Sequence, residues 1–130
     1  MTAPRVGCGA AILDAQGRWL LARRLTAPEA GHFGLLGGKI DAGEATRAAI
    51  KREIAEEIGV EIDLLGFLCA VDQIGPDGEH WVSIVERVRI VSGVPAIREP
   101  AKLADLGWFE PGALPAPLTQ AARTALAALG

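Results

Sequence analysis

The 130-residue sequence has few of the side chains that build metal clusters with sulfur ligands or disulfide frameworks. It contains only two cysteines and two histidines. Cys8 and Cys69 stand alone, without a CXXC motif or a histidine at a recognised spacing, so we expect neither a zinc site nor a disulfide scaffold. We expect both thiols to be reduced and buried in strands, as in a cytoplasmic protein.

An excess of positive charge and a long apolar run are also missing. The formal net charge is −3, and no segment resembles an arginine-rich surface interleaved with aromatic residues, so we expect no nucleic-acid polymer as a partner. No apolar stretch approaches the roughly 20 residues of a membrane span. The N-terminus lacks the pattern of a signal peptide. We therefore expect a cytoplasmic protein with no membrane partner.

Length and composition favour one folded domain over residues 1–130. Half of the residues are hydrophobic and 22% are charged, which argues against disorder. A chain of 130 residues can bury one proper core but not two. No linker, repeat or low-complexity tract divides it.

Hydrophobic periodicity predicts the order strands, helix, strands, helix. We expect strands over 6–13, 19–23, 62–73, 80–91 and 106–109, a loop over 25–31, an extended piece over 33–36, and helices over 45–58 and 118–129. Ile50, Ile54 and Ile58 repeat at helical spacing and predict one buried stripe, and Gly59 stands where a C-cap glycine belongs. This order predicts an α/β protein with a mixed sheet between helices.

The most informative segment is Gly38–Val60, GKIDAGEATRAAIKREIAEEIGV. On a helix, Glu53, Glu56 and Glu57 lie on one side, because they are three and four residues apart. Glu44 precedes the helix and can reach the same region. Carboxylates are the ligands that Mg²⁺ prefers, and clustered acids repel one another unless a cation is bound. The segment therefore predicts a divalent-cation site suited to neutralising and hydrolysing a phosphate chain.

An ordinary solvated helix face is the alternative interpretation. Lys51, Arg52 and Glu53, followed by further glutamates, could form ion pairs along an exposed helix. A solvated helix does not need glycines at these offsets, in front of it at Gly37–Gly38 and behind it at Gly59. The glycines therefore favour the functional interpretation.

The segment resembles the signature of the Nudix hydrolases at every fixed position. Those positions are Gly38, Glu44, Arg52, Glu53, Ile54, Glu56, Glu57, Gly59 and Val60. The resemblance implies the Nudix fold, an α/β/α sandwich with a mixed central sheet, over essentially the whole chain. It also implies a Mg²⁺-dependent enzyme that hydrolyses a diphosphate bond in a nucleotide-like substrate. Mn²⁺ would satisfy the same oxygen ligands.

The resemblance implies roles for individual residues of the motif. Glu56 and Glu57 would be metal ligands, and Glu53 would be the general base or an additional ligand, a choice that the sequence leaves open. The backbone carbonyl of Gly38 would be a further ligand. A turn at Gly37–Gly38 would let the main chain come close to a bound molecule.

Arg52 would support this centre as a residue that holds structure. It would pair with Glu44 and fix the loop, because a planar guanidinium suits a bidentate bond better than lysine does. Gly43 would allow the tight approach to Glu44. Glu99, further along the chain, would be an additional metal ligand or simply a loop charge. The family pattern often has proline at the position of Leu36. Without the fixed φ of proline, the entry to the loop is less rigid.

Weaker resemblances outside the motif point to the MutT-like branch, which acts on nucleoside triphosphates. They lie in residues 5–12, 20–24, 30–33, 80–82, 99–102, 108–109 and 114–115. The candidate substrate-binding residues are Arg23, Arg24, Phe33, Gly37, Lys39 and Trp81. The arginines could instead be solvated charges, and Phe33 and Trp81 could be core aromatics rather than platforms for a base.

Three functions remain open on the sequence. The leading hypothesis is hydrolysis of a nucleoside triphosphate to the monophosphate and pyrophosphate. The second is hydrolysis of ADP-ribose, dinucleoside polyphosphates or another nucleoside diphosphate derivative. The third is a non-catalytic, nucleotide-binding Nudix domain, although no carboxylate of the motif is missing here. A homodimer is also open, since no apolar stripe marks an interface.

Overall fold

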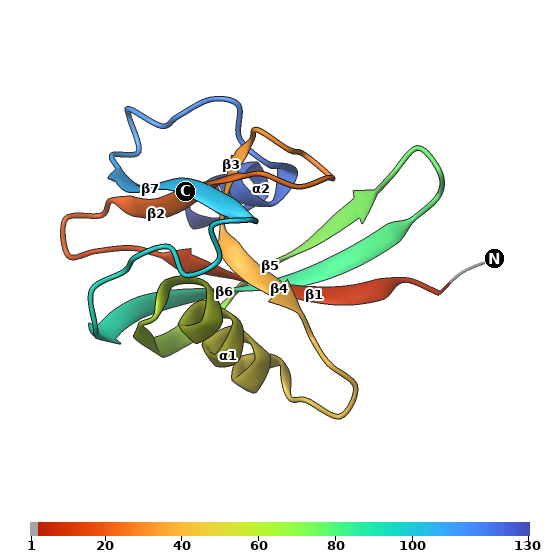
Figure 1. The fold of residues 1–130 in the computed structure, drawn as a ribbon, viewed down its shortest axis with the longest axis horizontal. Coiled ribbons are helices and arrows are strands. Elements are labelled where there is room, and N and C mark those ends of the chain that lie inside the picture. Colours follow the sequence, from red (N-terminus) through yellow and green to blue (C-terminus); the bar gives the residue numbers. More distant parts are fainter. Residues whose placement is uncertain (1–2) are drawn as a thin grey trace.

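The chain folds into two β-sheets and two helices, as the computed structural model shows for residues 3–130, which it describes (Figure 1). The elements are β1 (Arg5–Ile12), β2 (Trp19–Arg24), β3 (Phe33–Gly34), β4 (Leu36–Lys39), α1 (Thr46–Ile58), β5 (Glu61–Ile74), β6 (His80–Ser92), β7 (Leu103–Phe109) and α2 (Gln120–Leu129).

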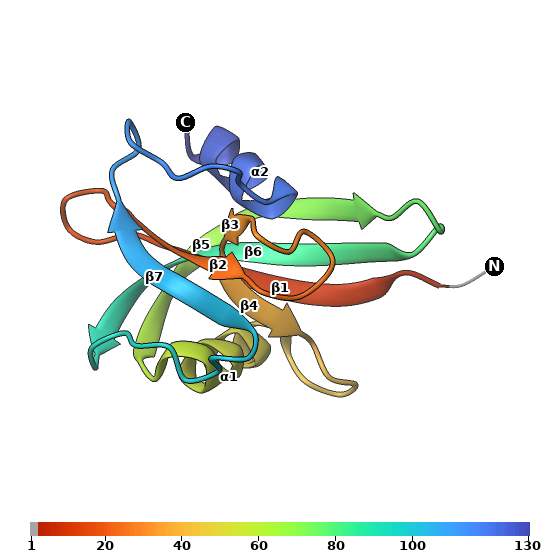
Figure 2. The same cartoon turned by 45° about the horizontal axis from the view of Figure 1, so that its top comes forward.

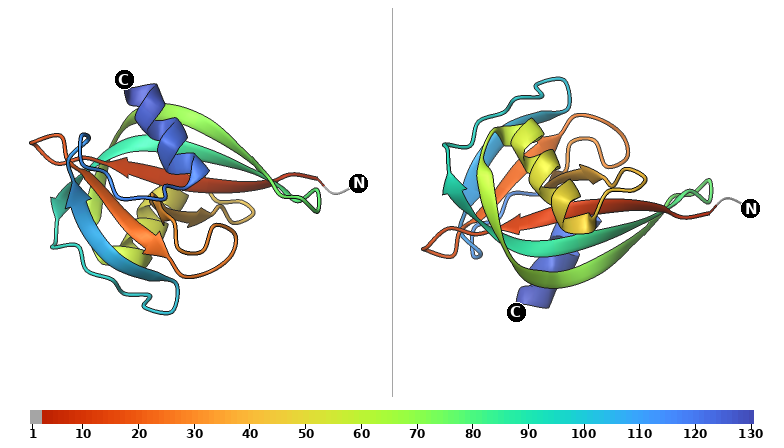
Figure 3. Two further views of the ribbon diagram at one scale, coloured as in Figure 1. Left: turned by 90° about the horizontal axis from the view of Figure 1, so that it is seen from above. Right: turned by 90° about the horizontal axis from the view of Figure 1, so that it is seen from below.

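The larger sheet is mixed and has the order β4-β1-β6-β5. β1 runs antiparallel to β4 and parallel to β6, and β5 and β6 form a long antiparallel hairpin. A smaller antiparallel sheet has the order β3-β2-β7. The helices cover opposite faces of the larger sheet, α2 on the face seen from above and α1 on the face seen from below (Figure 3). This arrangement confirms the predicted mixed sheet between helices.

Helix α1 is held by the isoleucine stripe that the sequence predicts. Ile50, Ile54 and Ile58 are all 0% exposed and pack into the core between α1 and the larger sheet. The helix ends at Gly59, whose left-handed φ of 71° lets its N–H donate to the carbonyl of Ala55. The isoleucine stripe thereby fixes the helix against the sheet, which sets the direction of its glutamates.

A smaller cluster of buried side chains lies on the opposite face of the sheet, under α2. Successive side chains of β1 point to opposite faces, so Ala11 packs toward α2 while Ile12 packs toward α1. The first turn of α2 is capped by Thr119, whose hydroxyl accepts from the N–H of Ala122 at 3.2 Å. Figure 2 shows α2 lying across β5 beside the small sheet.

Several boundaries differ from the prediction. The extended piece over 33–36 divides at Leu35, so β3 joins the smaller sheet and β4 the larger one. Gly37 and Gly38 lie in strand β4 rather than in a turn. They pair with Gly9 and Cys8 of β1, and glycine is needed for this close pairing because a Cβ at Gly37 would overlap the backbone of Cys8.

Three further differences are smaller. β7 begins at Leu103 rather than 106, because Leu103 is buried and pairs with Arg24 on β2. Cys8 is buried in β1 as predicted, whereas Cys69 in β5 is only half-buried. Both cysteines are free thiols. Within the described residues, neither helix has the length and apolar character needed to cross a membrane.

Candidate active site

The site begins where α1 meets β4, at Glu57. This residue is 7% exposed, and its Oε1 accepts a hydrogen bond from the backbone N–H of Gly37 at 2.7 Å. Burial raises the pKa of Glu57 to about 8, and the Gly37 N–H acts in the opposite direction. The nearby negative charges of Glu53 and Glu99 add to the rise of this pKa. Glu57 is thus a buried acid in negative surroundings.

Glu53 lies one helical turn before Glu57 and packs on the same strand. Its carboxylate rests against the Cα of Gly38 so closely that a Cβ at that position would overlap it. Arg52 fixes this carboxylate from the other side, since its Nη1 donates to Glu53 Oε1 at 2.9 Å. Only glycine at position 38 leaves room for this acid beside β4.

Arg52 joins the loop before α1 to the helix. Its Nε and Nη2 donate to the two carboxylate oxygens of Glu44, at 2.7 and 2.9 Å, and Nη2 also donates to the carbonyl of Lys39. The bonds from Arg52, with the N–H of Asp41, lower the pKa of Glu44 to about 2, and the bonds to Glu44 and Glu53 raise the pKa of Arg52. The pairing implied by the resemblance is therefore present. Gly43, with φ 79°, bends the chain into Glu44.

Glu56 and Glu99 flank this centre. Glu56 is half exposed and lies 3.3 Å from Arg52 Nη1. Glu99 follows Arg98, whose N–H donates to the carbonyl of Glu57 at 2.9 Å, so the segment before β7 docks on the end of α1. The carboxylate of Glu99 is 3.6 Å from Lys102 Nζ. The structure thus places Glu53, Glu56 and Glu57 on the C-terminal half of α1, with Glu99 on the segment that docks beside it.

Oxygen donors of this kind fit a divalent cation. Among residues 3–130, no three His, Cys, Asp or Glu side chains converge as a ready-made metal cluster. The donor chemistry is nevertheless right, because hard divalent cations prefer carboxylate oxygens. A cation would also offset the cost of an ionised, buried Glu57 beside two further acids. Glu53, Glu56 and Glu57 are the side chains that would hold it.

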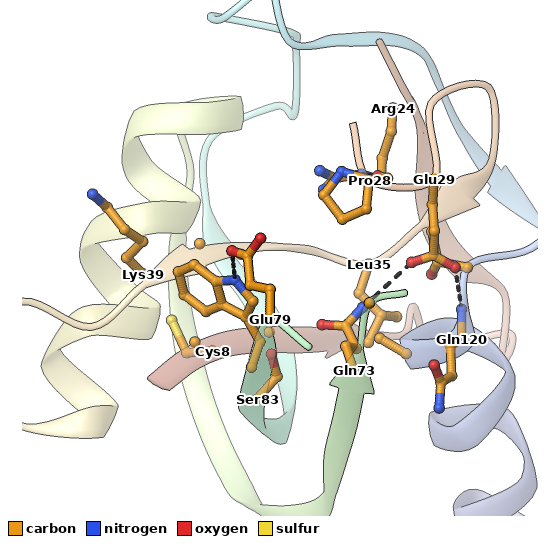
Figure 4. A pocket seen from close by; sticks show the side chains of 18 of the residues that line it. Cys8, Arg24, Pro28, Glu29, Leu35, Lys39, Gln73, Glu79, Ser83 and Gln120 are labelled. Atoms are coloured by element: carbon orange, nitrogen blue, oxygen red, sulfur yellow. Dashed lines mark hydrogen bonds between the residues drawn. The ribbon is translucent and has the colours of Figure 1, made fainter. Parts of the chain in front are cut away.

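A cavity of about 920 Å³ opens beside this centre and runs over the face of the sheet that α2 covers (Figure 4). Four predicted substrate-binding residues line it, namely Arg24, Gly37, Lys39 and Trp81. Trp81 is oriented by its indole N–H, which donates to Glu79 at 2.9 Å. The cavity therefore extends from β4, the strand against which Glu53 and Glu57 pack, to a half-buried aromatic ring.

The structure does not bring Arg23 and Phe33 to this cavity. Neighbouring residues of a strand point to opposite sides, so Arg23 leaves the face of Arg24 and pairs with Asp105 at 2.7 Å. The ring of Phe33 packs edge to face against Phe109, with centroids 5.9 Å apart. These contacts belong to the smaller sheet.

Sequence reasoning missed the residues at the far end of the cavity. Glu29, in the loop before β3, has a left-handed φ of 62° and accepts from the N–H of Gln120 at 2.9 Å. Its other oxygen lies 3.3 Å from Nε2 of Gln73. Gln73 and Gln120 are 44 and 91 positions from Glu29 in the sequence, and no local pattern predicts contacts between such distant residues.

Known proteins resemble the chain over nearly all of its length. Residues 3–129 match the family model described as NUDIX domain. The crystal structure of a MutT NUDIX hydrolase from Burkholderia pseudomallei is 48% identical, with a TM-score of 0.95 over 99% of this chain and 100% of that one.

Curated relatives are named as diphosphatases or pyrophosphatases of nucleotides. A putative 8-oxo-dGTP diphosphatase 2 of Mycobacterium tuberculosis is 37% identical over 101 residues, 68% of this chain and 70% of the relative. An ADP-ribose pyrophosphatase of Methanocaldococcus jannaschii is 34% identical over 107 residues, 80% of this chain and 61% of the relative. With the acidic helix and glycine-bearing strand in place, the chain belongs to the Nudix family and is a MutT-like Nudix hydrolase.

Proposed function

We propose that this pyrophosphohydrolase acts on a nucleoside triphosphate, with Mg²⁺, and releases the monophosphate and pyrophosphate. One observation carries the proposal. The cavity is lined at one end by Gly37, Gly38 and Lys39, the strand on which Glu53 and Glu57 rest. A nucleotide whose base and sugar fill the cavity would therefore direct its phosphates to the acidic end of α1.

The residues of the site would have separate roles. A bound divalent cation would supply charge neutralisation and a more acidic water. Glu56 and Glu57 would hold the cation, and Glu53 would accept a proton from the attacking water or serve as a further ligand. Arg52 would keep these acids in place through its bonds to Glu44 and Glu53. The amine of Lys39, at the mouth of the cavity, would attract the phosphate chain.

The names of the relatives support two substrate classes. The Mycobacterium tuberculosis relative is named for 8-oxo-dGTP, which favours a nucleoside triphosphate. The Methanocaldococcus jannaschii relative is named for ADP-ribose, which keeps a nucleoside diphosphate derivative as the second candidate. The two differ in their products, because only a triphosphate releases pyrophosphate.

Product analysis tests the proposal. The protein is incubated with Mg²⁺ and canonical, oxidised and methylated nucleoside triphosphates, with ADP-ribose and diadenosine polyphosphates in parallel. Monophosphate and pyrophosphate from a triphosphate, absent with Glu57→Gln, are the expected result. Cleavage of ADP-ribose alone, to AMP and ribose 5-phosphate, would replace the proposal by its alternative. No turnover of any compound would contradict both.

A further inference from the structure

The far end of the cavity carries a carboxylate that the hydrolysis reaction does not use. Glu29 lies across the cavity from Lys39, on the loop before β3 (Figure 4). Its two oxygens are held by donors from two other elements, the Gln120 N–H at the start of α2 and the Gln73 amide on β5. The carboxylate is therefore fixed in position before any ligand binds.

These two hydrogen bonds leave acceptor capacity on Glu29. An ionised carboxylate has about four lone-pair sites and no donor, so about half of them stay open to a ligand. The N-terminus of α2 stabilises the negative charge at this place. A group that binds here must therefore present N–H or O–H donors and no acceptor that faces the oxygens.

Among the common bases, guanine meets this requirement. Its Watson–Crick edge presents a ring N–H next to an exocyclic amino group, two donors side by side, and 8-oxoguanine shares that edge. Adenine and cytosine place a ring nitrogen lone pair beside their amino group, and this lone pair would oppose the carboxylate. Hypoxanthine has the ring N–H but lacks the amino group.

Resting on the proposed function, we propose that Glu29 is a specificity-determining residue, which selects nucleotides with a guanine-type base by accepting from the ring N–H and the amino group. The base would lie at the α2 end of the cavity, and the phosphates would lie toward Gly38 and Lys39. The selection would be independent of whether the base is oxidised at its five-membered ring.

A comparison of bases on wild type and Glu29→Gln tests this proposal. We expect wild-type kcat/KM to be at least about tenfold higher for dGTP than for dATP, since a bidentate contact to a base is worth roughly a factor of ten or more. The value for dITP should lie between them, because hypoxanthine keeps one of the two donors. A glutamine offers one acceptor and one donor, which match adenine. In Glu29→Gln the preference for dGTP over dATP should therefore shrink or reverse.

Asp72→Asn is the matched control. It makes the same change from carboxylate to amide on the same strand as Gln73, at an exposed residue that pairs with His80 and does not line the cavity. It should keep the wild-type ratio. If Glu29→Gln lowered kcat/KM equally for every base, Glu29 would only be stabilising α2, and the proposal would be overturned.

Equilibrium binding of monophosphates separates this proposal from the proposed function. A preference for dGMP over dIMP and dAMP that disappears in Glu29→Gln would support base selection even if no triphosphate were hydrolysed. Triphosphate hydrolysis without any preference for guanine would leave the proposed function intact and reject the role of Glu29.

Discussion

Glu57 of α1 and the backbone N–H of Gly37 on β4 are joined by a hydrogen bond of 2.7 Å. This bond ties the helix that carries the acids to the strand that lines the cavity. It also leaves Glu57 buried, because the carboxylate is enclosed between helix and sheet. The chemistry of the site therefore depends on a group whose ionisation is opposed by its surroundings.

The first prediction concerns pH. The pKa of Glu57 is raised from 4.5 to about 8, so the folded protein holds this proton more tightly than the unfolded chain does. The resulting stability is complete below the unfolded value and is lost as pH rises through about 8. Melting temperatures in EDTA across this range should fall with pH in wild type relative to Glu57→Gln.

Glu56→Gln is the control for that experiment, because its side chain is 52% exposed. The melting temperature of Glu56→Gln should change with pH as that of wild type does. A Glu57→Gln variant with the wild-type slope would show that another group carries the dependence.

A second prediction concerns added metal. Mg²⁺ should raise the free energy of unfolding, by about 2.7 kcal/mol when its concentration is 100 times the dissociation constant. The apparent affinity should rise with pH up to about 8, since the cation displaces the proton of Glu57. Thermal melts with and without Mg²⁺ measure the effect, and equal stabilisation of Glu57→Gln would place the cation elsewhere.

A third prediction concerns Arg52→Lys. Lysine keeps the charge but cannot bond both oxygens of Glu44 and the Lys39 carbonyl together. We expect kcat/KM to fall by about 10- to 100-fold, the usual loss when a residue that orients metal ligands is changed. Circular dichroism should show the fold retained.

Arg89→Lys provides the comparison for Arg52→Lys. Arg89 pairs with Asp63 at 3.1 Å, and both side chains are more than half exposed. This variant should keep wild-type activity. A similar loss in both variants would mean that the effect does not come from the loop before α1.

The elements that the sequence predicts best are those with local signals. Ile50, Ile54 and Ile58 repeat at helical spacing, and Gly59 closes the same helix, so α1 and its acids follow from neighbouring residues. The mixed sheet follows from the order of elements and from the family resemblance. These features need no knowledge of contacts between distant segments.

Long-range contacts account for what the sequence does not predict. Phe33 and Arg23 have the chemistry of ligand-binding residues, but each contacts a residue of β7 instead, Phe109 and Asp105 respectively. Leu35 separates two strands of different sheets because each side pairs with a different partner. Glu29 stands in a loop without a motif. Its place in the cavity comes from contacts with α2 and β5.

The fourth prediction separates the two glycines of β4. A Cβ at Gly37 would overlap the backbone of Cys8 and Gly9, which cannot move without separating β1 from β4. Gly37→Ala should therefore destabilise the fold, by about 1–3 kcal/mol or more. Urea unfolding monitored by tryptophan fluorescence measures this loss.

A Cβ at Gly38 would instead overlap the end of a flexible side chain, the carboxylate of Glu53. That carboxylate can rotate away, so Gly38→Ala should cost less stability than Gly37→Ala but should displace an acid of the active site and lower kcat. Gly112→Ala is the control for both, because nothing lies within 4 Å of a Cβ there. Full activity in Gly38→Ala would mean that Glu53 need not rest against β4 for the reaction, which would leave Glu56 and Glu57 as the acids on which turnover depends.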